Sequence, residues 1–323
     1  MKQVNGRYLP IPNYLQELMQ ANPAFQHEAL PEYTIHQYDP LLDSPNMTPT
    51  DWSTIARDIC DNYTDYDGFI VLHGTDTMAY TASALAFMLK DLAKPVIVTG
   101  SQIPLCEIRN DAQENLISSL LLAANYAIPE VGLYFHSQLF RGCRAVKVDA
   151  DGFDAFASPN CAPLATLGTD VELNKGLIRP LPNTDTIDLR EIADPGTVGA
   201  LRIFPGMSAR ILENMLQSPL RGLILETYGA GNAPTNDPDF HKALADAVER
   251  GIVIVDCTQC LRGTVDLSKY ATGSALADIG VISGYDMTPE AALTKLAYLL
   301  TRYENTAVIK EKIQEDLRGE LTN

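Results

Sequence analysis

The most informative stretch of this sequence is Asp67-Gly68-Phe69-Ile70-Val71-Leu72-His73-Gly74-Thr75-Asp76-Thr77-Met78. Residues 69–72 form a short uninterrupted apolar run, which predicts a strand buried on both faces. The segment 79–90 is rich in Ala, Leu and Met and predicts a helix. Thr75, Asp76 and Thr77 therefore lie where a strand ends and a helix begins. In an open α/β sheet, this is the edge at which ligands bind.

The same polar residues have a simpler interpretation. Asp and Thr are both preferred at the N-caps of helices, so Asp76 or Thr77 could serve only to start the following helix. The pattern alone favours this local capping role over a functional one.

Composition and charge restrict the class of protein. The 323 residues are enough for two ordinary domains, and 46% apolar with 20% charged residues is typical of a globular protein. A net charge of −17 argues against a nucleic-acid partner, because phosphate binding needs clustered Lys and Arg. No apolar run approaches the roughly 20 residues of a membrane span, so we expect no membrane partner. Six scattered cysteines indicate reduced thiols and a cytoplasmic location.

Strands and helices alternate along the chain, which predicts an α/β fold. In the first part we expect strands at 33–38, 69–72, 94–100, 131–135 and 144–148, and helices that begin at 48, 79 and 111. In the second part we expect strands at 200–204, 222–225 and 251–255, and helices at 208–216, 240–250 and from 288 onward. A Pro- and Asn-rich segment separates the two series. The predicted organisation is a larger domain 1–178, a linker 179–197 and a smaller α/β domain 198–323.

Known catalytic motifs are missing from the sequence. It contains no G-x-S-x-G, no Walker A lysine and no H-E-x-x-H. Its five histidines show no metal-ligand spacing, and Tyr228-Gly229-Ala230-Gly231-Asn232 lacks the third glycine of a dinucleotide fingerprint. These absences restrict the candidate chemistry. Hydroxyls and carboxylates at strand ends remain as the candidate chemistry.

Several long blocks together resemble one family. They are His73-Gly74-Thr75-Asp76-Thr77-Met78, Val98-Thr99-Gly100-Ser101-Gln102-Ile103-Pro104, Asp149-Ala150-Asp151-Gly152-Phe153-Asp154-Ala155-Phe156-Ala157-Ser158-Pro159-Asn160 and Leu317-Arg318-Gly319-Glu320-Leu321. These blocks span nearly the whole chain. The sequence resembles the bacterial-type L-asparaginases, and within them the cytoplasmic type I branch.

The resemblance implies a reaction and a set of site residues. Family members are amidohydrolases that convert L-asparagine to L-aspartate and ammonia without metal or cofactor. Their Thr-Asp pair and distant Lys match Thr75, Asp76 and Lys147, and a tyrosine of their mobile N-terminal loop matches Tyr8. Three further residues match the pocket that holds the substrate, namely Asp43, Ser44 and Ser101. The family has a flavodoxin-like larger domain and assembles as homodimers or homotetramers.

The chemistry of these side chains suits such roles. Threonine is a poor nucleophile unless a neighbouring group takes its proton. A lysine accepts a proton only when neutral, which costs about 4–5 kcal/mol at pH 7 from a reference pKa near 10.4. A neighbouring carboxylate increases that cost. We therefore expect Thr75, Asp76 and Lys147 to act as a coupled unit. Without the resemblance, Lys147 would be an ordinary solvated lysine and Asp43-Ser44 an ordinary turn.

The sequence departs from the family pattern at its beginning. Family members start with a strand and a Thr-Gly-Gly-Thr-Ile-Gly turn, whose first threonine is the nucleophile that forms the acyl-enzyme. Neither this turn nor its strand occurs in the 323 residues. The rest of the pocket is present, so we expect that the native protein starts upstream of Met1.

Two other functions fit the same residues. A non-catalytic protein could use the Asp43, Ser44 and Thr75 pocket to bind asparagine or aspartate. An amidotransferase subunit that discharges a glutamine-derived or tRNA-linked amide shares the fold, but it normally carries an extra domain, for which 323 residues leave no room.

Overall fold

The computed structural model describes residues 1–184, 186–192 and 196–322, which form two compact units. The first unit comprises residues 1–158 and 162–189, and the second comprises residues 159–161 and 190–323. Asp185 and residues 193–195, which fall within the linker predicted over 179–197, lie outside the described residues. The domain boundaries at 178 and 198 stay a prediction.

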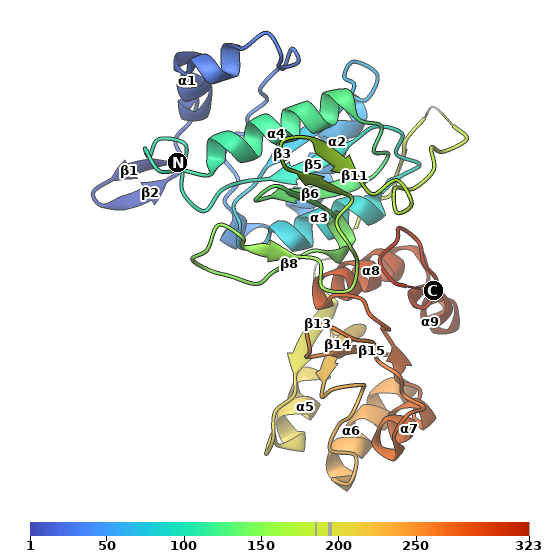
Figure 1. Cartoon of the computed structure of the whole chain (residues 1–323). Coiled ribbons are helices and arrows are strands. Elements are labelled where there is room, and N and C mark those ends of the chain that lie inside the picture. The colour runs from blue at the N-terminus through green and yellow to red at the C-terminus, as the bar shows by residue number, and fades with distance from the viewer. Residues whose placement is uncertain (185, 193–195, 323) are drawn as a thin grey trace. The chain divides into compact units, whose positions relative to one another are not determined.

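A six-stranded sheet forms the centre of the first unit, with the strand order β11-β10-β7-β6-β5-β3 (Figure 1). Its strands are β3 (Phe69–Leu72), β5 (Val96–Thr99), β6 (Val131–Phe135), β7 (Gln138–Arg141), β10 (Ala165–Leu167) and β11 (Val171–Leu173). The strands β3, β5 and β6 run parallel, and β7, β10 and β11 continue the sheet antiparallel. The parallel strands end together at one edge, as the sequence predicted.

Helices cover both faces of this sheet. The helix α4 (Ala112–Asn125) packs on one face through Leu122, which joins a cluster with Ile97 of β5 and Tyr134 of β6. The helix α3 (Met78–Met88) lies on the other face (Figure 1) and is buried along nearly its whole length. A helix that is apolar all round is typical of a protein core. The helix α2 (Pro49–Asp61) packs on α3, and its buried Trp52 donates a hydrogen bond from Nε1 to Thr81 Oγ1 at 3.0 Å.

Four sequence predictions for the first unit were wrong in detail. The helix predicted at 79–90 ends at Met88, and Leu89 and Lys90 form a short strand instead. The strand β3 is only partly buried, and Leu72 is 44% exposed, because β3 is the edge strand of the sheet among the described residues. Residues 33–38 form no strand, because they pair with no other strand and lie against helices instead. The strand predicted at 144–148 shrinks to β8 (Val146–Lys147), since a 3-10 turn, η3 (Gly142–Arg144), precedes it.

Short elements complete the first unit. They are β1 (Lys2–Val4), β2 (Arg7–Leu9), α1 (Tyr14–Ala21), η1 (Pro23–Gln26), η2 (Ser44–Asn46), β4 (Leu89–Lys90), β9 (Phe156–Ala157) and β12 (Asp188–Leu189). The strand β8 pairs antiparallel with β9, so that residues 146–157 form a hairpin. We call this segment the Lys147 hairpin.

The second unit is a smaller parallel α/β fold. Its strands, in spatial order, are β13 (Val198–Arg202), β14 (Gly222–Thr227), β15 (Val253–Thr258) and β16 (Ile282–Ser283). Its helices are α5 (Ala209–Met215), α6 (Pro238–Glu249), α7 (Ala271–Asp278), α8 (Pro289–Arg302) and α9 (Thr306–Ile313). Each strand and helix predicted here is present, displaced by a few residues. A flavodoxin-like larger domain followed by a smaller α/β domain is therefore the observed fold class.

A buried carboxyl lies within β15. Asp256 is fully buried, accepts a hydrogen bond from Thr227 Oγ1 at 2.6 Å, and has no partner for Oδ2 among the described residues. Burial without a compensating positive charge disfavours the ionised form. It raises the pKa of Asp256 from 3.8 to about 7.

This buried carboxyl predicts a pH-dependent stability. As the pH rises, the unfolded state releases the Asp256 proton near pH 3.8 and the folded state only near 7. The free energy of unfolding should therefore fall through this window, by at most about 4 kcal/mol, and level off above it. Asp256→Asn removes this loss because the amide stays neutral. Urea unfolding of both proteins over a pH series measures the effect, with the exposed Asp278→Asn as control. Parallel curves for the wild type and Asp256→Asn would contradict the assignment.

Candidate active site at the carboxyl ends of β3 and β5

Two glycines allow the ends of neighbouring strands to approach closely. His73, just after β3, donates a backbone hydrogen bond to Thr99 O of β5 at 2.8 Å. A Cβ on Gly100 would lie 2.1 Å from His73 O, and a Cβ on Gly74 would lie 2.3 Å from Ser44 Oγ. Real side chains do not tolerate such distances, so these positions require glycine. The close packing brings residue 44 next to the turn after β3.

Thr77 holds the Asp43-Ser44 segment in place. It occupies the N-cap position of α3, but its side chain makes no capping hydrogen bond. Its Oγ1 instead donates to Ser44 O at 2.7 Å. Capping, the simpler interpretation of the sequence, is therefore wrong for Thr77. The buried Ser44 therefore lies against the β3–α3 turn, and Asp43, the residue before it, is half-buried.

The Lys147 hairpin brings a lysine to the same turn. Lys147 Nζ donates hydrogen bonds to Thr75 Oγ1 at 2.9 Å and to Asp76 Oδ1 at 3.0 Å. Lys147 is 72 positions from Thr75 and 71 positions from Asp76 in the sequence. The structure therefore brings together the three side chains that the resemblance named as a group. Both contacts are donated by the ammonium group, as expected of a charged lysine.

The ion pair of Lys147 and Asp76 is accessible to solvent. The Asp76 side chain is 62% exposed and that of Lys147 is 22% exposed. Exposed ion pairs contribute only about 0–1 kcal/mol to stability. The ion pair therefore contributes little to the stability of the fold. It lies beside the Thr75 hydroxyl, where both charged groups are accessible to a ligand.

The loop after β5 is fixed on both sides of Ser101. Asn115 Nδ2 donates to Gly100 O at 3.0 Å. The carboxylate of Asp111 accepts from the backbone N–H groups of Gln102 at 3.0 Å and of Ile103 at 2.9 Å. Ser101 follows β5, which pairs with β3, so it lies at the same sheet edge as Thr75.

Gln102 is a site residue that the sequence analysis missed. Its Oε1 accepts from Thr75 Oγ1 at 3.2 Å, and its Nε2 donates to Gly152 O of the Lys147 hairpin at 3.0 Å. The only signal in the sequence was its place directly after Ser101, at the end of a predicted strand.

His73, one of the five histidines without metal-ligand spacing, has a structural place at the same turn. Its Nδ1 lies 2.6 Å from Gly74 O, and its Nε2 lies 2.8 Å from Thr81 Oγ1. Burial lowers the pKa of His73, while the hydrogen bond to Gly74 raises it. A neutral ring that donates from Nδ1 and accepts at Nε2 satisfies both contacts. His73 thus connects the turn after β3 to α3.

The predicted site residues Tyr8, Asp43 and Ser101 make no contact with Thr75, Asp76 or Lys147 among the described interactions, and Tyr8 is held by another partner. It lies on β2 with 43% of its surface exposed, and its hydroxyl donates to Glu107 Oε1 at 2.8 Å. The hydrogen bond to Glu107 raises the pKa of Tyr8. A catalytic role for Tyr8 stays a prediction.

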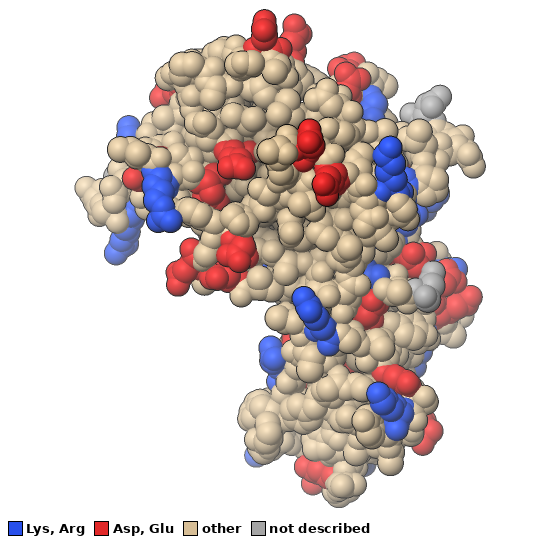
Figure 2. All heavy atoms as spheres, viewed as in Figure 1, with Lys and Arg blue, Asp and Glu red and all other residues tan. Residues whose placement is uncertain are grey.

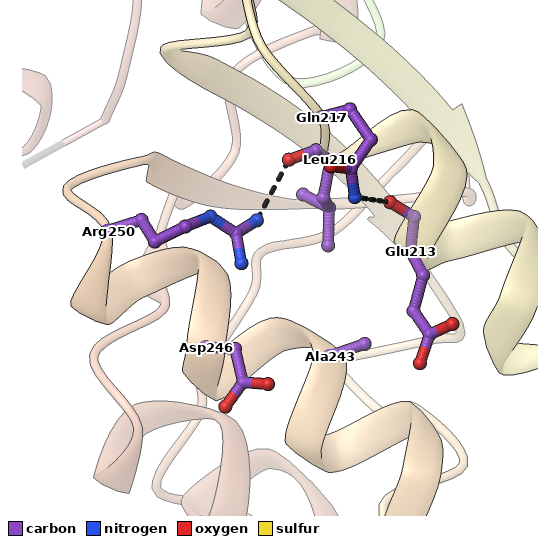
Figure 3. Close-up of a pocket in the computed structure, with 6 residues that line it drawn as sticks. All are labelled: Glu213, Leu216, Gln217, Ala243, Asp246 and Arg250. Carbon is purple, nitrogen blue, oxygen red and sulfur yellow. Dashed lines mark hydrogen bonds between the residues drawn. The ribbon is translucent and has the colours of Figure 1, made fainter.

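A separate pocket lies between α5 and α6 of the second unit (Figure 3). Arg250 donates from Nη2 to Leu216 O at 2.9 Å, and Gln217 donates from Nε2 to Glu213 O at 2.6 Å. Its lining holds no hydroxyl or thiol nucleophile, so it offers no counterpart to the Thr75 group.

On the face shown in Figure 2, Lys and Arg are dispersed among Asp and Glu. None of the helices in the described residues is long and apolar enough to cross a membrane.

Both parts of this chain match models of known protein families. Residues 3–179 match the family model "Asparaginase, N-terminal", and residues 197–312 match "Glutaminase/Asparaginase C-terminal domain". The chain is 50% identical to L-asparaginase 1 of Escherichia coli K12 over 322 residues, which cover 100% of this chain and 94% of that protein.

Solved structures show the same likeness. L-asparaginase I of Vibrio cholerae superimposes with a TM-score of 0.91 at 48% identity, covering 100% of this chain and 95% of that one. The thermostable L-asparaginase of Thermococcus kodakarensis gives a TM-score of 0.87 at 32% identity, covering 97% and 92%. Both halves of the chain match family models, and proteins named L-asparaginase match it over its full length. The chain therefore belongs to the asparaginase family.

Proposed function

We propose that this protein is an amidohydrolase that converts L-asparagine to L-aspartate and ammonia. The observation that carries the proposal is the contact of Lys147 Nζ with both Thr75 Oγ1 and Asp76 Oδ1, at 2.9 and 3.0 Å. The proteins of E. coli and V. cholerae that match the full chain are named L-asparaginases.

Asp43, Ser44 and Ser101 are proposed to hold the substrate. A carboxylate and hydroxyls suit the α-ammonium and α-carboxylate of an amino acid, because each can form charge-assisted hydrogen bonds. Ser44 is fixed through Thr77 and Gly74, so its position does not depend on the ligand. A pre-formed pocket of this kind avoids the entropic cost of ordering on binding.

We propose that Thr75, Asp76 and Lys147 transfer a proton and stabilise the negative charge that develops during amide hydrolysis. The resemblance assigns the attack, and the threonine acyl-enzyme that it forms, to the Thr-Gly-Gly-Thr-Ile-Gly turn, which these 323 residues do not contain. Within this chain, Asp76 holds the Lys147 ammonium against the Thr75 hydroxyl. That arrangement stabilises negative charge developing on an oxygen beside Thr75, and it gives the leaving ammonia a proton source. We propose Tyr8 as an additional catalytic residue supplied by the N-terminal hairpin.

The family resemblance also supports an assembly and a location. We propose that the protein acts as a homodimer or homotetramer in the cytoplasm. Sedimentation of the purified protein should give a mass of two or four chains at micromolar concentration. A single-chain mass throughout that range would contradict the proposed assembly.

Removal of the Lys147 ammonium should strongly reduce turnover with little effect on folding. Lys147→Met, introduced in the chromosomal gene, should lower kcat for ammonia release by about a thousandfold or more, because groups that act as a unit fail together. Lys175→Met, which changes an exposed lysine of the first unit, serves as the control. A Lys147→Met protein that keeps wild-type kcat would contradict the proposed mechanism.

Removal of the Asp43 charge, which we propose to bind the α-ammonium of asparagine, should weaken substrate binding more than it slows turnover. Asp43→Asn should raise KM for asparagine by roughly 10- to 100-fold, the cost of losing a hydrogen bond to a charged group. Calorimetric titration with L-aspartate should show a matching loss of affinity, and the exposed Asp67→Asn should behave as wild type. Tight aspartate binding by a wild type that releases no ammonia would instead favour the non-catalytic binding protein.

A further inference from the structure

Gln102 connects the Thr75 hydroxyl to the hairpin that carries the lysine. It accepts from Thr75 Oγ1 with Oε1 and donates from Nε2 to Gly152 O. We infer that Gln102 is a positioning residue for the hydrolysis, which sets the direction of the Thr75 hydroxyl and holds Lys147 against it. This inference rests on the proposed function.

The hydrogen-bonding capacity of each group fixes the orientation of the amide. A backbone carbonyl can only accept, so Gly152 O selects the NH2 end of the Gln102 side chain. The carbonyl end must then face Thr75, and since it too can only accept, the Thr75 hydroxyl must donate to it. The hydroxyl proton therefore points at Gln102, and a lone pair of Thr75 Oγ1 is left for Lys147 Nζ at 2.9 Å.

Both ends of this connection are anchored. The backbone N–H of Gln102 donates to Asp111 Oδ2 at 3.0 Å, next to the start of α4. The backbone N–H of Gly152 donates to Asp149 Oδ1 at 3.0 Å. The hydrogen bonds of the hairpin backbone to Asp149 lower the pKa of that carboxyl, so it stays an acceptor at neutral pH. The amide therefore bridges two fixed segments.

Loss of this bridge should affect turnover more than binding. Without the acceptor, the Thr75 hydroxyl is free to rotate toward other partners. Without the donor, the turn of the Lys147 hairpin loses its described hydrogen bond to the loop after β5. No described contact joins Gln102 to Asp43 or Ser44, the proposed substrate-binding residues, so the affinity for asparagine should change little.

The test is Gln102→Met in the full-length protein, since methionine keeps the length of the side chain and removes both hydrogen bonds. We expect kcat for ammonia release to fall about tenfold, the equivalent of one to two hydrogen bonds, with KM unchanged within about threefold. Amide hydrogen exchange over residues 149–154 should also become about tenfold faster, because their opening costs less free energy. The matched control is Gln217→Met in the second unit, which also removes a side-chain amide that donates to a backbone carbonyl, that of Glu213 in α5.

Gln102→Glu provides a second variant in case the first does not fold. It keeps an acceptor for Thr75 and loses the donor to Gly152, so hairpin exchange should rise as in Gln102→Met while kcat falls less. A wild type that releases no ammonia would contradict the proposed function itself. An active wild type whose Gln102→Met variant keeps its kcat and its hairpin exchange would contradict this inference alone. A rise in KM at unchanged kcat would likewise overturn it, because it would make Gln102 a binding residue.

Discussion

The contact of the Lys147 ammonium with both the Thr75 hydroxyl and the Asp76 carboxylate is the interaction that the rest of the structure has to hold in place. The ion pair is too exposed to contribute much to stability. It persists because the backbone on either side of it is fixed by other contacts. The Lys147 hairpin is held by strand pairing, and the turn after β3 is held by Gly74, Thr77 and their contacts with Ser44.

The scaffold explains why these groups meet at one edge of the sheet. The parallel strands β3 and β5 end side by side, and each passes into a polar loop before its helix begins. Asp111 and Asn115, at the start of α4, hold the loop after β5 by their side chains. Backbone anchored in this way is what a precise site requires, because small displacements of reacting groups cost much of the rate. The second unit also has a buried carboxyl on a parallel strand, Asp256 of β15, but no described contact joins a lysine to it.

Most helices and strands could be predicted from the sequence, whereas the loops that connect them could not. The apolar run 131–135 and the start of the helix at 111 were located closely, because a strand buried on both faces leaves an uninterrupted apolar run and the helix follows a polar segment. Residues 33–38 were wrongly predicted as a strand, because pairing depends on a neighbour that local composition does not reveal. Lys147 was named only through the family resemblance, since on its own it looks like a solvated lysine. Gln102 was missed altogether, because its importance lies in two contacts made across the fold.

The most direct test of the central claim uses L-asparagine labelled with nitrogen-15 in the side-chain amide, incubated with the protein purified from its own cells. We expect labelled ammonium in a one-to-one ratio with L-aspartate, and no labelled ammonium when the label is on the α-amino group. Bound asparagine that stays chemically unchanged, or ammonium released from the α-amino group, would contradict it.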